Sequence, residues 1–143
     1  PLMTTPLTVW YRGNLVKSWS PSAYTKLHTI PDAESFWRFF NNLPPLDGGL
    51  MCIMRDPAGP YWEHPSNRGG GAWTMMVMES GDPKTVLTDL CARLFTGTLP
   101  PCVTGVTICP RAANYSVKIW ANSNAEHDSS IPANPASFKP FGK

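Results

Sequence analysis

Sixteen prolines and eleven glycines interrupt this sequence of 143 residues, so none of its regular elements can be long. Proline lacks the backbone N–H that helices and sheets use, and glycine loses the most conformational freedom on folding. The segments between them mostly show the alternation and the β-branched or aromatic content of strands. Six strands and a weak seventh are predicted on this basis: 6–12, 23–30, 50–55, 72–79, 103–109, 114–120 and 136–141.

Two segments, 32–43 and 82–97, have helical spacing instead. Each begins with an aspartate that can cap the helix, and the second also has proline at its first helical position and a terminal glycine. The predicted apolar face of the first is Phe36, Phe39, Phe40 and Leu43, and that of the second is Val86, Leu87, Leu90, Cys91 and Leu94. This order of elements favours an α+β fold, an antiparallel sheet with helices on one face.

Length and composition indicate a single domain over residues 1–143. A chain of this length can bury roughly 70% of the surface that its unfolded form exposes, and 42% of the residues are hydrophobic. The net charge of +2 permits an anionic partner. The sequence lacks the dense clusters of lysine and arginine that are usual in proteins that bind duplex DNA. The segment 122–137 is poor in apolar residues and is predicted to be a loop or a trimmed segment.

The four cysteines do not form a metal-binding pattern, because no two of them are spaced as C-x-x-C. Each lies in an apolar stretch, so reduced, buried thiols in a cytoplasmic protein are favoured over disulfides. The longest apolar run, 50–54, is far too short to cross a membrane. We therefore expect no metal, no cofactor and no membrane association. Because the first residue is proline, the sequence is expected to be an excerpt of a longer chain.

No catalytic motif is found in the sequence, so an enzyme is not expected. There is no nucleophile elbow, no H-E-x-x-H and no Cys/His pair at a known spacing. The histidines, His28, His64 and His127, are scattered along the sequence. Glu63 is the only acid whose neighbours suggest a role in catalysis or binding. The glycine run 69–71 lacks the residues of a phosphate-binding loop, and it is predicted to let the chain turn tightly into the next strand.

The tryptophans carry the most functional information. Trp10, Trp73 and Trp120 lie in predicted strands and suit buried or sheet-face positions. Trp19 and Trp62 lie in proline-bounded loops with few apolar neighbours, which suggests a platform that stacks on a flat ligand.

Glu63 directly follows Trp62 in the sequence. Its carboxylate can accept two N–H donors from the edge of a stacked ligand, and guanine offers such a pair at N1 and N2. Two ring platforms beside a carboxylate would also suit a sugar, so a glycan-binding domain is an alternative.

Trp37 directly follows Phe36 in the first predicted helix, so its side chain is rotated by about 100° from the centre of the apolar stripe. Spacing alone leaves two positions open for it. One is the edge of the interface between helix and sheet, and the other is an exposed aromatic anchor for a partner.

Taken in order, these motifs closely resemble the eukaryotic translation initiation factor 4E family, whose members bind the 7-methylguanosine cap of messenger RNA. The resemblance covers about residues 6 to 121 and implies a curved sheet, helices on its convex face and the cap in its concave face. It rests on W-Y-R at Trp10, K-S-W at Trp19, F-W-R-F-F-N-N-L around Trp37, P-Y-W-E and N-R-G-G-G-A-W through Trp73, and P-R-A with V-K-I-W from Arg111 to Trp120.

The resemblance implies a role for each of the conspicuous side chains. Trp19 and Trp62 look like the two rings that sandwich the methylated base, whose positive charge adds a cation–π attraction. Glu63 resembles the carboxylate that takes the N1–H and N2–H donors, and Trp120 resembles the residue that touches the N7-methyl group. Arg111 matches the arginine that holds the cap phosphates, a task suited to its forked donors.

Trp37 resembles the exposed dorsal tryptophan of the family. That residue docks the Y-x-x-x-x-L-hydrophobic motif of the scaffold factor 4G and of inhibitory 4E-binding proteins. The resemblance therefore implies a cytoplasmic factor that recruits a scaffold for translation initiation. The second helix lacks the family's usual tryptophan, so further partner contacts are not carried over.

The sequence departs from the family at positions that bind phosphate. Ala72 stands where the family usually has a basic residue, Ser116 where it has a lysine, and Cys109 where it has an asparagine. Lys118 points to the same strand face as Ser116 and is the candidate substitute. Phosphate binding is expected to be weaker than usual or to use other lysines, namely Lys17, Lys139 or Lys143.

The residues after Trp120 are too few for the family's third long helix, its cap-side loop and its last strand. Either residues are missing from the sequence or this paralogue is trimmed. The departures suggest a kinetoplastid-type paralogue, whose messages carry a hypermethylated cap. They also leave open a translational repressor or interaction module on the same fold, which has weakened or lost cap binding and keeps the Trp37 surface.

Overall fold

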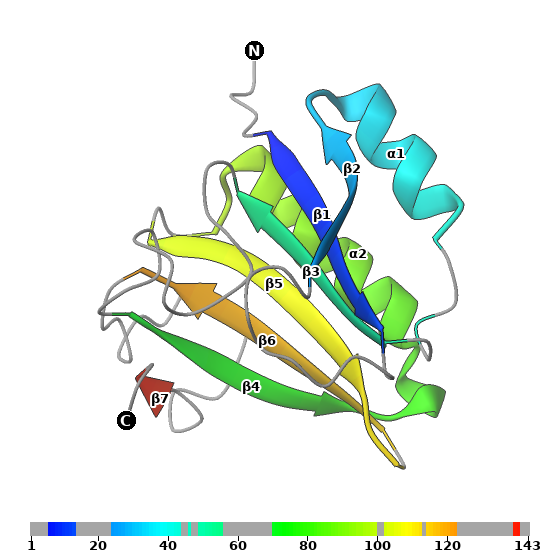
Figure 1. The fold of residues 1–143 in the computed structure, drawn as a ribbon, viewed down its shortest axis with the longest axis vertical. Coiled ribbons are helices and arrows are strands. Elements are labelled where there is room, and N and C mark those ends of the chain that lie inside the picture. Colours follow the sequence, from blue (N-terminus) through cyan, green and yellow to red (C-terminus); the bar gives the residue numbers. More distant parts are fainter. Residues whose placement is uncertain are drawn as a thin grey trace.

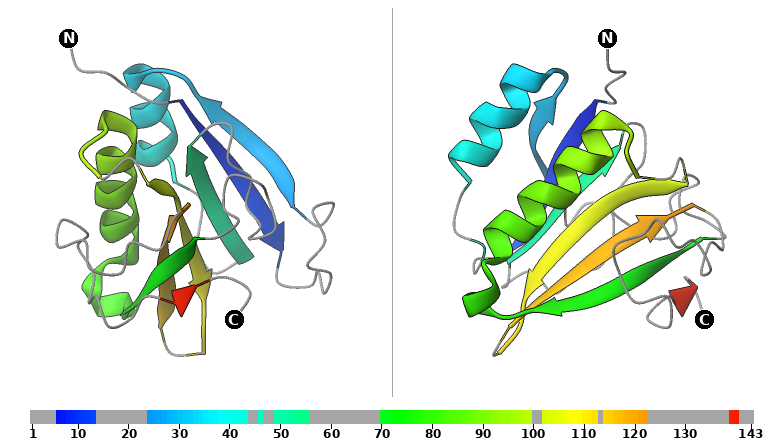
Figure 2. Two further views of the ribbon diagram at one scale, coloured as in Figure 1. Left: turned by 90° about the vertical axis from the view of Figure 1, so that its left-hand side faces the viewer. Right: turned by 180° about the vertical axis from the view of Figure 1, so that it is seen from behind.

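The protein folds into one curved antiparallel sheet with two helices on its convex face (Figures 1 and 2). The computed structural model describes residues 6–13, 24–43, 46, 49–55, 70–99, 102–112, 114–122 and 139–140. The strands are β1 (Leu7–Gly13), β2 (Thr25–Ile30), β3 (Gly49–Arg55), β4 (Gly71–Val77), β5 (Val103–Pro110), β6 (Tyr115–Ala121) and β7 (Lys139–Pro140). The helices are α1 (Ala33–Asn41), α2 (Pro83–Thr96) and the short 3-10 helix η3 (Glu79–Gly81).

The sheet order is β2-β1-β3-β5-β6-β4-β7, and every neighbouring pair is antiparallel. The predicted α+β fold is thereby confirmed, and each predicted strand and helix has a counterpart. β5 and β6 form the predicted hairpin. The weak last strand is the two-residue β7, which pairs with the edge of β4. Of the predicted loop 122–137, only Asn122 lies among the described residues.

Aspartate caps start both helices, as the sequence predicts. Asp32 accepts a hydrogen bond from the backbone N–H of Ser35 at 2.8 Å, and this bond lowers the pKa of the Asp32 carboxyl. Asp82 accepts from the hydroxyl of Thr85 at 2.6 Å, and the pKa of its carboxyl is lowered for the same reason. Gly97 ends α2 with a left-handed backbone, φ 77°, which glycine adopts without steric cost.

The hydrophobic core fills the space between the sheet and the helices. Phe36 on α1 is 2% exposed, and its ring stacks on Phe95 of α2 with centroids 5.3 Å apart. Phe95 was absent from the predicted face of α2, and Val86, which was included, is only half-buried. Trp73 on β4 is 1% exposed, so its predicted buried position is confirmed.

The cysteines are unpaired thiols. Cys52 and Cys91 are fully buried, and this burial raises the pKa of both thiols. Because the thiolate is the reactive form, both side chains behave as small apolar groups. Cys102 and Cys109 are half-buried, so the prediction of buried thiols is confirmed for two of the four. Among the described helices, none is long and apolar enough to span a membrane.

Candidate functional site

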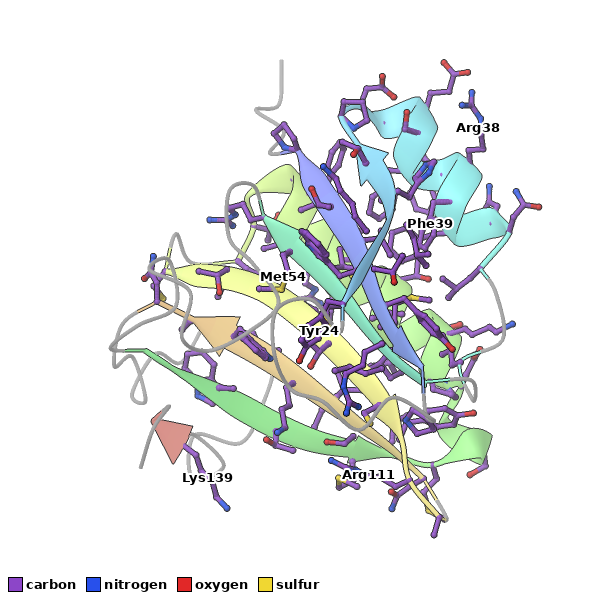
Figure 3. All side chains as sticks on the ribbon, in the orientation of Figure 1. Tyr24, Arg38, Phe39, Met54, Arg111 and Lys139 are labelled. Carbon is purple, nitrogen blue, oxygen red and sulfur yellow. The ribbon has the colours of Figure 1, made fainter. Side chains whose placement is uncertain are left out.

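The concave face of the sheet, opposite the helices, carries a second and smaller apolar cluster. Cys52 and Met54 on β3 are fully buried there. Four partly buried side chains pack against them: Trp10, Tyr24, Leu50 and Trp120. Figure 3 shows Tyr24 and Met54 near the centre of this face. Three of the six side chains are aromatic, so the floor of the concave face can contact a flat ligand.

Cross-strand pairing continues this face toward the edge formed by β4 and β7. Directly paired residues of antiparallel strands point to the same side of a sheet. Thr107 on β5 pairs with Cys52 on one side and with Lys118 of β6 on the other, and Lys118 in turn pairs with Thr74 of β4. Lys118 therefore lies on the concave face with Trp120, two residues away on the same strand.

Gly105 brings Met54 and Trp120 close together. It is paired with both of them, and the register shifts just before it, between Val103 and Gly105. A Cβ atom added to Gly105 would lie 2.8 Å from the carbonyl oxygen of Ile53 and would overlap the thioether of Met54. This position was not predicted from the sequence, although a glycine inside a strand pattern indicates a close approach of this kind.

We expect Gly105→Ala to lower the free energy of unfolding by about 1–3 kcal/mol, because β3 must move to admit the methyl group. Gly13→Ala is the matched control, since the nearest atom to its added Cβ is a ring carbon of Tyr11 at 3.8 Å. Urea denaturation followed by tryptophan fluorescence measures both. Equal unfolding midpoints for the two variants would show that Gly105 is not a tight contact.

Charge is divided between the two layers of the molecule. The described strands carry five basic residues and no acidic one: Arg12, Lys26, Arg55, Lys118 and Lys139. The acids among the described residues lie on helical segments or their caps: Asp32, Glu34, Glu79, Asp82 and Asp89. Two of these acids form exposed ion pairs along their own helices, Glu34 with Arg38 and Asp89 with Arg93. The described strands therefore carry a net positive charge, which favours anions.

Arg111 adds a further cation at the end of the hairpin between β5 and β6. Its backbone N–H donates to the carbonyl of Asn114 at 2.7 Å, which closes the turn. Its side chain is exposed, and Figure 3 shows it at the far end of the sheet from Lys139. Among the described residues, no group of three His, Cys, Asp or Glu side chains could hold a metal ion.

Trp37 is exposed on the outer surface of α1, with 49% of its side chain accessible. Its ring meets the edge of Phe36 at a centroid distance of 5.0 Å, while Phe36 itself points into the core. The structure therefore decides between the two positions that spacing left open. A large exposed aromatic ring fixed to a rigid helix is a typical anchor for a protein partner.

Three of the residues that were predicted to bind the ligand, Trp19, Trp62 and Glu63, lie outside the described residues, as do Lys17 and Lys143. Segments that contain the first three join described elements of the concave face. Residues 14–23 lead from β1 to Tyr24 of the apolar cluster, and residues 56–69 lead from β3 to Gly70. A Cβ atom at Gly70 would overlap the carbonyl of Ala121 on β6, so this glycine permits a close approach of two backbones.

The family model described as eukaryotic initiation factor 4E matches residues 2–134 of this chain. The chain belongs to the initiation factor 4E family. Factor 4E of Dictyostelium discoideum is 32% identical over 79 residues, which are 50% of this chain and 32% of that protein. Factor 4E-2 of Arabidopsis thaliana is 25% identical over 136 residues, 87% of this chain and 55% of that protein. The chain, where nearly all of it is matched, thus spans about half of the length of the relative.

Initiation factor 4E structures also share the fold. The complex of Caenorhabditis elegans factor 4E-3 with the 4E-binding protein Mextli and a cap analog superposes with a TM-score of 0.74. The identity is 18%, and the match covers 91% of this chain and 78% of that one. This likeness confirms the predicted 4E fold, a curved sheet backed by helices.

Proposed function

We propose that this chain binds the 7-methylguanosine cap of messenger RNA on the concave face of its sheet, and that it is not an enzyme. The observation that carries the proposal is a ring and a cation two residues apart on β6, Trp120 and Lys118, on a sheet with no acid among its described strands. A cap joins a flat base to a chain of phosphates, so a binding site needs both kinds of side chain.

The base is held by the residues that the resemblance assigns. Trp19 and Trp62 stack on its two faces, and the positive charge of the methylated ring strengthens that stacking. Glu63 accepts the N1–H and N2–H donors, while Trp120 lies against the methyl group. A charged carboxylate suits a cationic base, since hydrogen bonds between ionised partners are about twice as strong as neutral ones.

The phosphates are held by Arg111 and Lys118. Their separate positions, at the hairpin turn and on the sheet, let them contact different phosphates of one chain. Ser116 and Ala72 pair with Met76 and Trp120 across β4 and β6 and carry no charge. Binding is therefore weaker than in relatives with basic residues at these positions, or it draws on a cation elsewhere.

The convex side docks a protein partner through Trp37. The 49% exposure of this ring supports the assignment, as does the 4E-binding protein in the complex of the Caenorhabditis elegans relative. The partner is a scaffold of the 4G type or a 4E-binding protein with a Y-x-x-x-x-L-hydrophobic motif. With both faces in use, the chain is a cytoplasmic translation initiation factor built as a single domain, residues 1–143.

Retention on 7-methyl-GTP resin tests the cap proposal. We expect elution by 7-methyl-GTP, or by its hypermethylated form, and no elution by GTP. Equal elution by GTP would refute recognition of the methylated base. A chain that does not bind the resin but captures the partner motif would be an interaction module, and one that binds glycans instead would support the sugar platform.

Phosphate contacts predict a dependence on the number of phosphates. We expect Arg111→Ala and Lys118→Ala each to weaken binding of 7-methyl-GTP by about tenfold, since a hydrogen bond to a charged group is worth about 1.5–3 kcal/mol and exposure reduces this. Binding of the nucleoside should change little. Tryptophan fluorescence titration measures both ligands, and Arg93→Ala on α2 is the control on the opposite layer. Equal losses for nucleoside and nucleotide would contradict a phosphate role.

A further inference from the structure

Lys139 lies at the free edge of the sheet, in register with the proposed cap site. β7 pairs with β4 so that Lys139 is opposite Ala72, and Ala72 is opposite Trp120 on β6. Because directly paired residues share a face, Lys139 belongs to the concave face together with Trp120. The two residues are separated by one strand, roughly 10 Å at the usual strand spacing.

Among the described residues, those on the strands beside Lys139 carry no negative charge. The side chain is exposed, and Figure 3 shows it at the outer edge of the sheet. Ala72, its partner in register, is 5% exposed and uncharged, and the described strands have no acid that would neutralise the ammonium group. Strand spacing and rise put the Cα atoms of Lys139 and Lys118 roughly 12 Å apart. Two flexible four-carbon stems can converge on one polyphosphate across that gap.

The other cations of the described strands are placed less well for this task. Lys26 is on β2, at the opposite edge of the sheet. Arg12 is buried on β1, and Arg55 ends β3. Among the basic strand residues that the structure describes, only Lys118 and Lys139 lie on the β6–β4–β7 side of the sheet, where Trp120 is found.

We propose that Lys139 is a phosphate-binding residue of the cap site, and that it supplies from the edge strand the positive charge that Ala72 cannot supply from β4. This inference rests on the proposed cap-binding function. Its ligand class is the oligophosphate of a methylated guanine nucleotide. The ammonium group donates to a phosphate oxygen, and no covalent step is involved.

Fluorescence titration of the whole chain with 7-methyl-GTP and with the nucleoside 7-methylguanosine tests the proposal. We expect Lys139→Ala to weaken binding of the triphosphate by about threefold to tenfold, the effect of one exposed charged contact. Lys139→Glu should weaken it further, and Lys139→Arg should retain it. The nucleoside should bind all variants equally. Lys84→Ala, which removes an exposed lysine of α2, should change neither affinity.

The sharpest comparison moves the positive charge from Lys139 on β7 to position 72 on β4, its partner in register. The double variant Lys139→Ala, Ala72→Lys should recover triphosphate affinity, because the two positions face each other in register. If the double variant does not fold, Lys139→Glu and Lys139→Arg still decide the question.

Unchanged triphosphate affinity in Lys139→Glu would overturn the inference and leave cap binding intact. An equal loss of nucleoside affinity would also overturn it, since it would mean a structural role for β7. Failure of the wild-type chain to bind either ligand refutes the cap proposal itself.

Discussion

Trp62→Ala is expected to abolish retention on 7-methyl-GTP resin. Removal of one ring of the proposed sandwich would eliminate stacking worth about 1–3 kcal/mol and a cation–π contribution of up to about 2 kcal/mol. A combined loss of about 2–4 kcal/mol lowers affinity roughly 30-fold to 700-fold. The sequence places Trp62 in a proline-bounded loop, so we expect the unfolding midpoint to be unchanged.

Trp62→Phe is the matched control, because it keeps an aromatic ring with a weaker attraction for a cation. It should bind more weakly than the wild type and more tightly than Trp62→Ala. Glu63→Gln tests the donor edge separately, since the amide keeps the shape and removes the charge. If Trp62→Ala still bound the resin at wild-type affinity, the two-ring site would be refuted whatever the role of Arg111.

Elements determined by local sequence were predicted correctly. The caps depend on one side chain and a backbone N–H three residues away, as at Asp32 and Ser35. The end of α2 depends on one glycine, Gly97, in a conformation that other residues avoid. Such signals span only a few positions, so a single sequence contains all the information that determines them.

Contacts between distant segments could not be predicted in the same way. The pairing of Lys139 with Ala72 joins strands that are far apart in the chain, and its register depends on the whole sheet. Gly105 was missed because the atoms that require a glycine, in Ile53 and Met54, belong to another strand. Phe95 was missed because its burial comes from the ring of Phe36 on the other helix, outside the stripe expected for α2 alone.

The candidate site also has a part that the sequence predicts and a part that only the assembled fold shows. The sequence identified Trp37, Trp120, Arg111 and Lys118 by residue type and motif, and the structure shows which layer each belongs to. Separation of charge between a basic sheet and acidic helices is not visible in a net charge of +2. It appears only once the strands are assembled, and it supports the proposal that the concave face binds an anionic ligand.

Trp37→Ala is expected to eliminate capture of a protein partner while cap binding continues. Exposed tryptophans at the centre of an interface commonly cost at least about 2 kcal/mol when truncated to alanine, about a 30-fold loss of affinity. The side chain is 49% exposed on α1, and the helix is anchored by Phe36 and Phe40, which stay in the core. The variant should therefore fold normally and bind 7-methyl-GTP as the wild type does.

Arg38→Ala is the control for Trp37→Ala, because it changes the next residue of the same helix and leaves the ring in place. Its guanidinium forms an exposed ion pair with Glu34 at 2.7 Å, a contact worth little in water. A peptide with the Y-x-x-x-x-L-hydrophobic motif, measured by calorimetry against all three proteins, should bind the wild type and Arg38→Ala alike. Full affinity for Trp37→Ala would remove the dorsal site from the proposal. Loss of both ligands would mean that α1 supports the sheet, and that the two faces do not act independently.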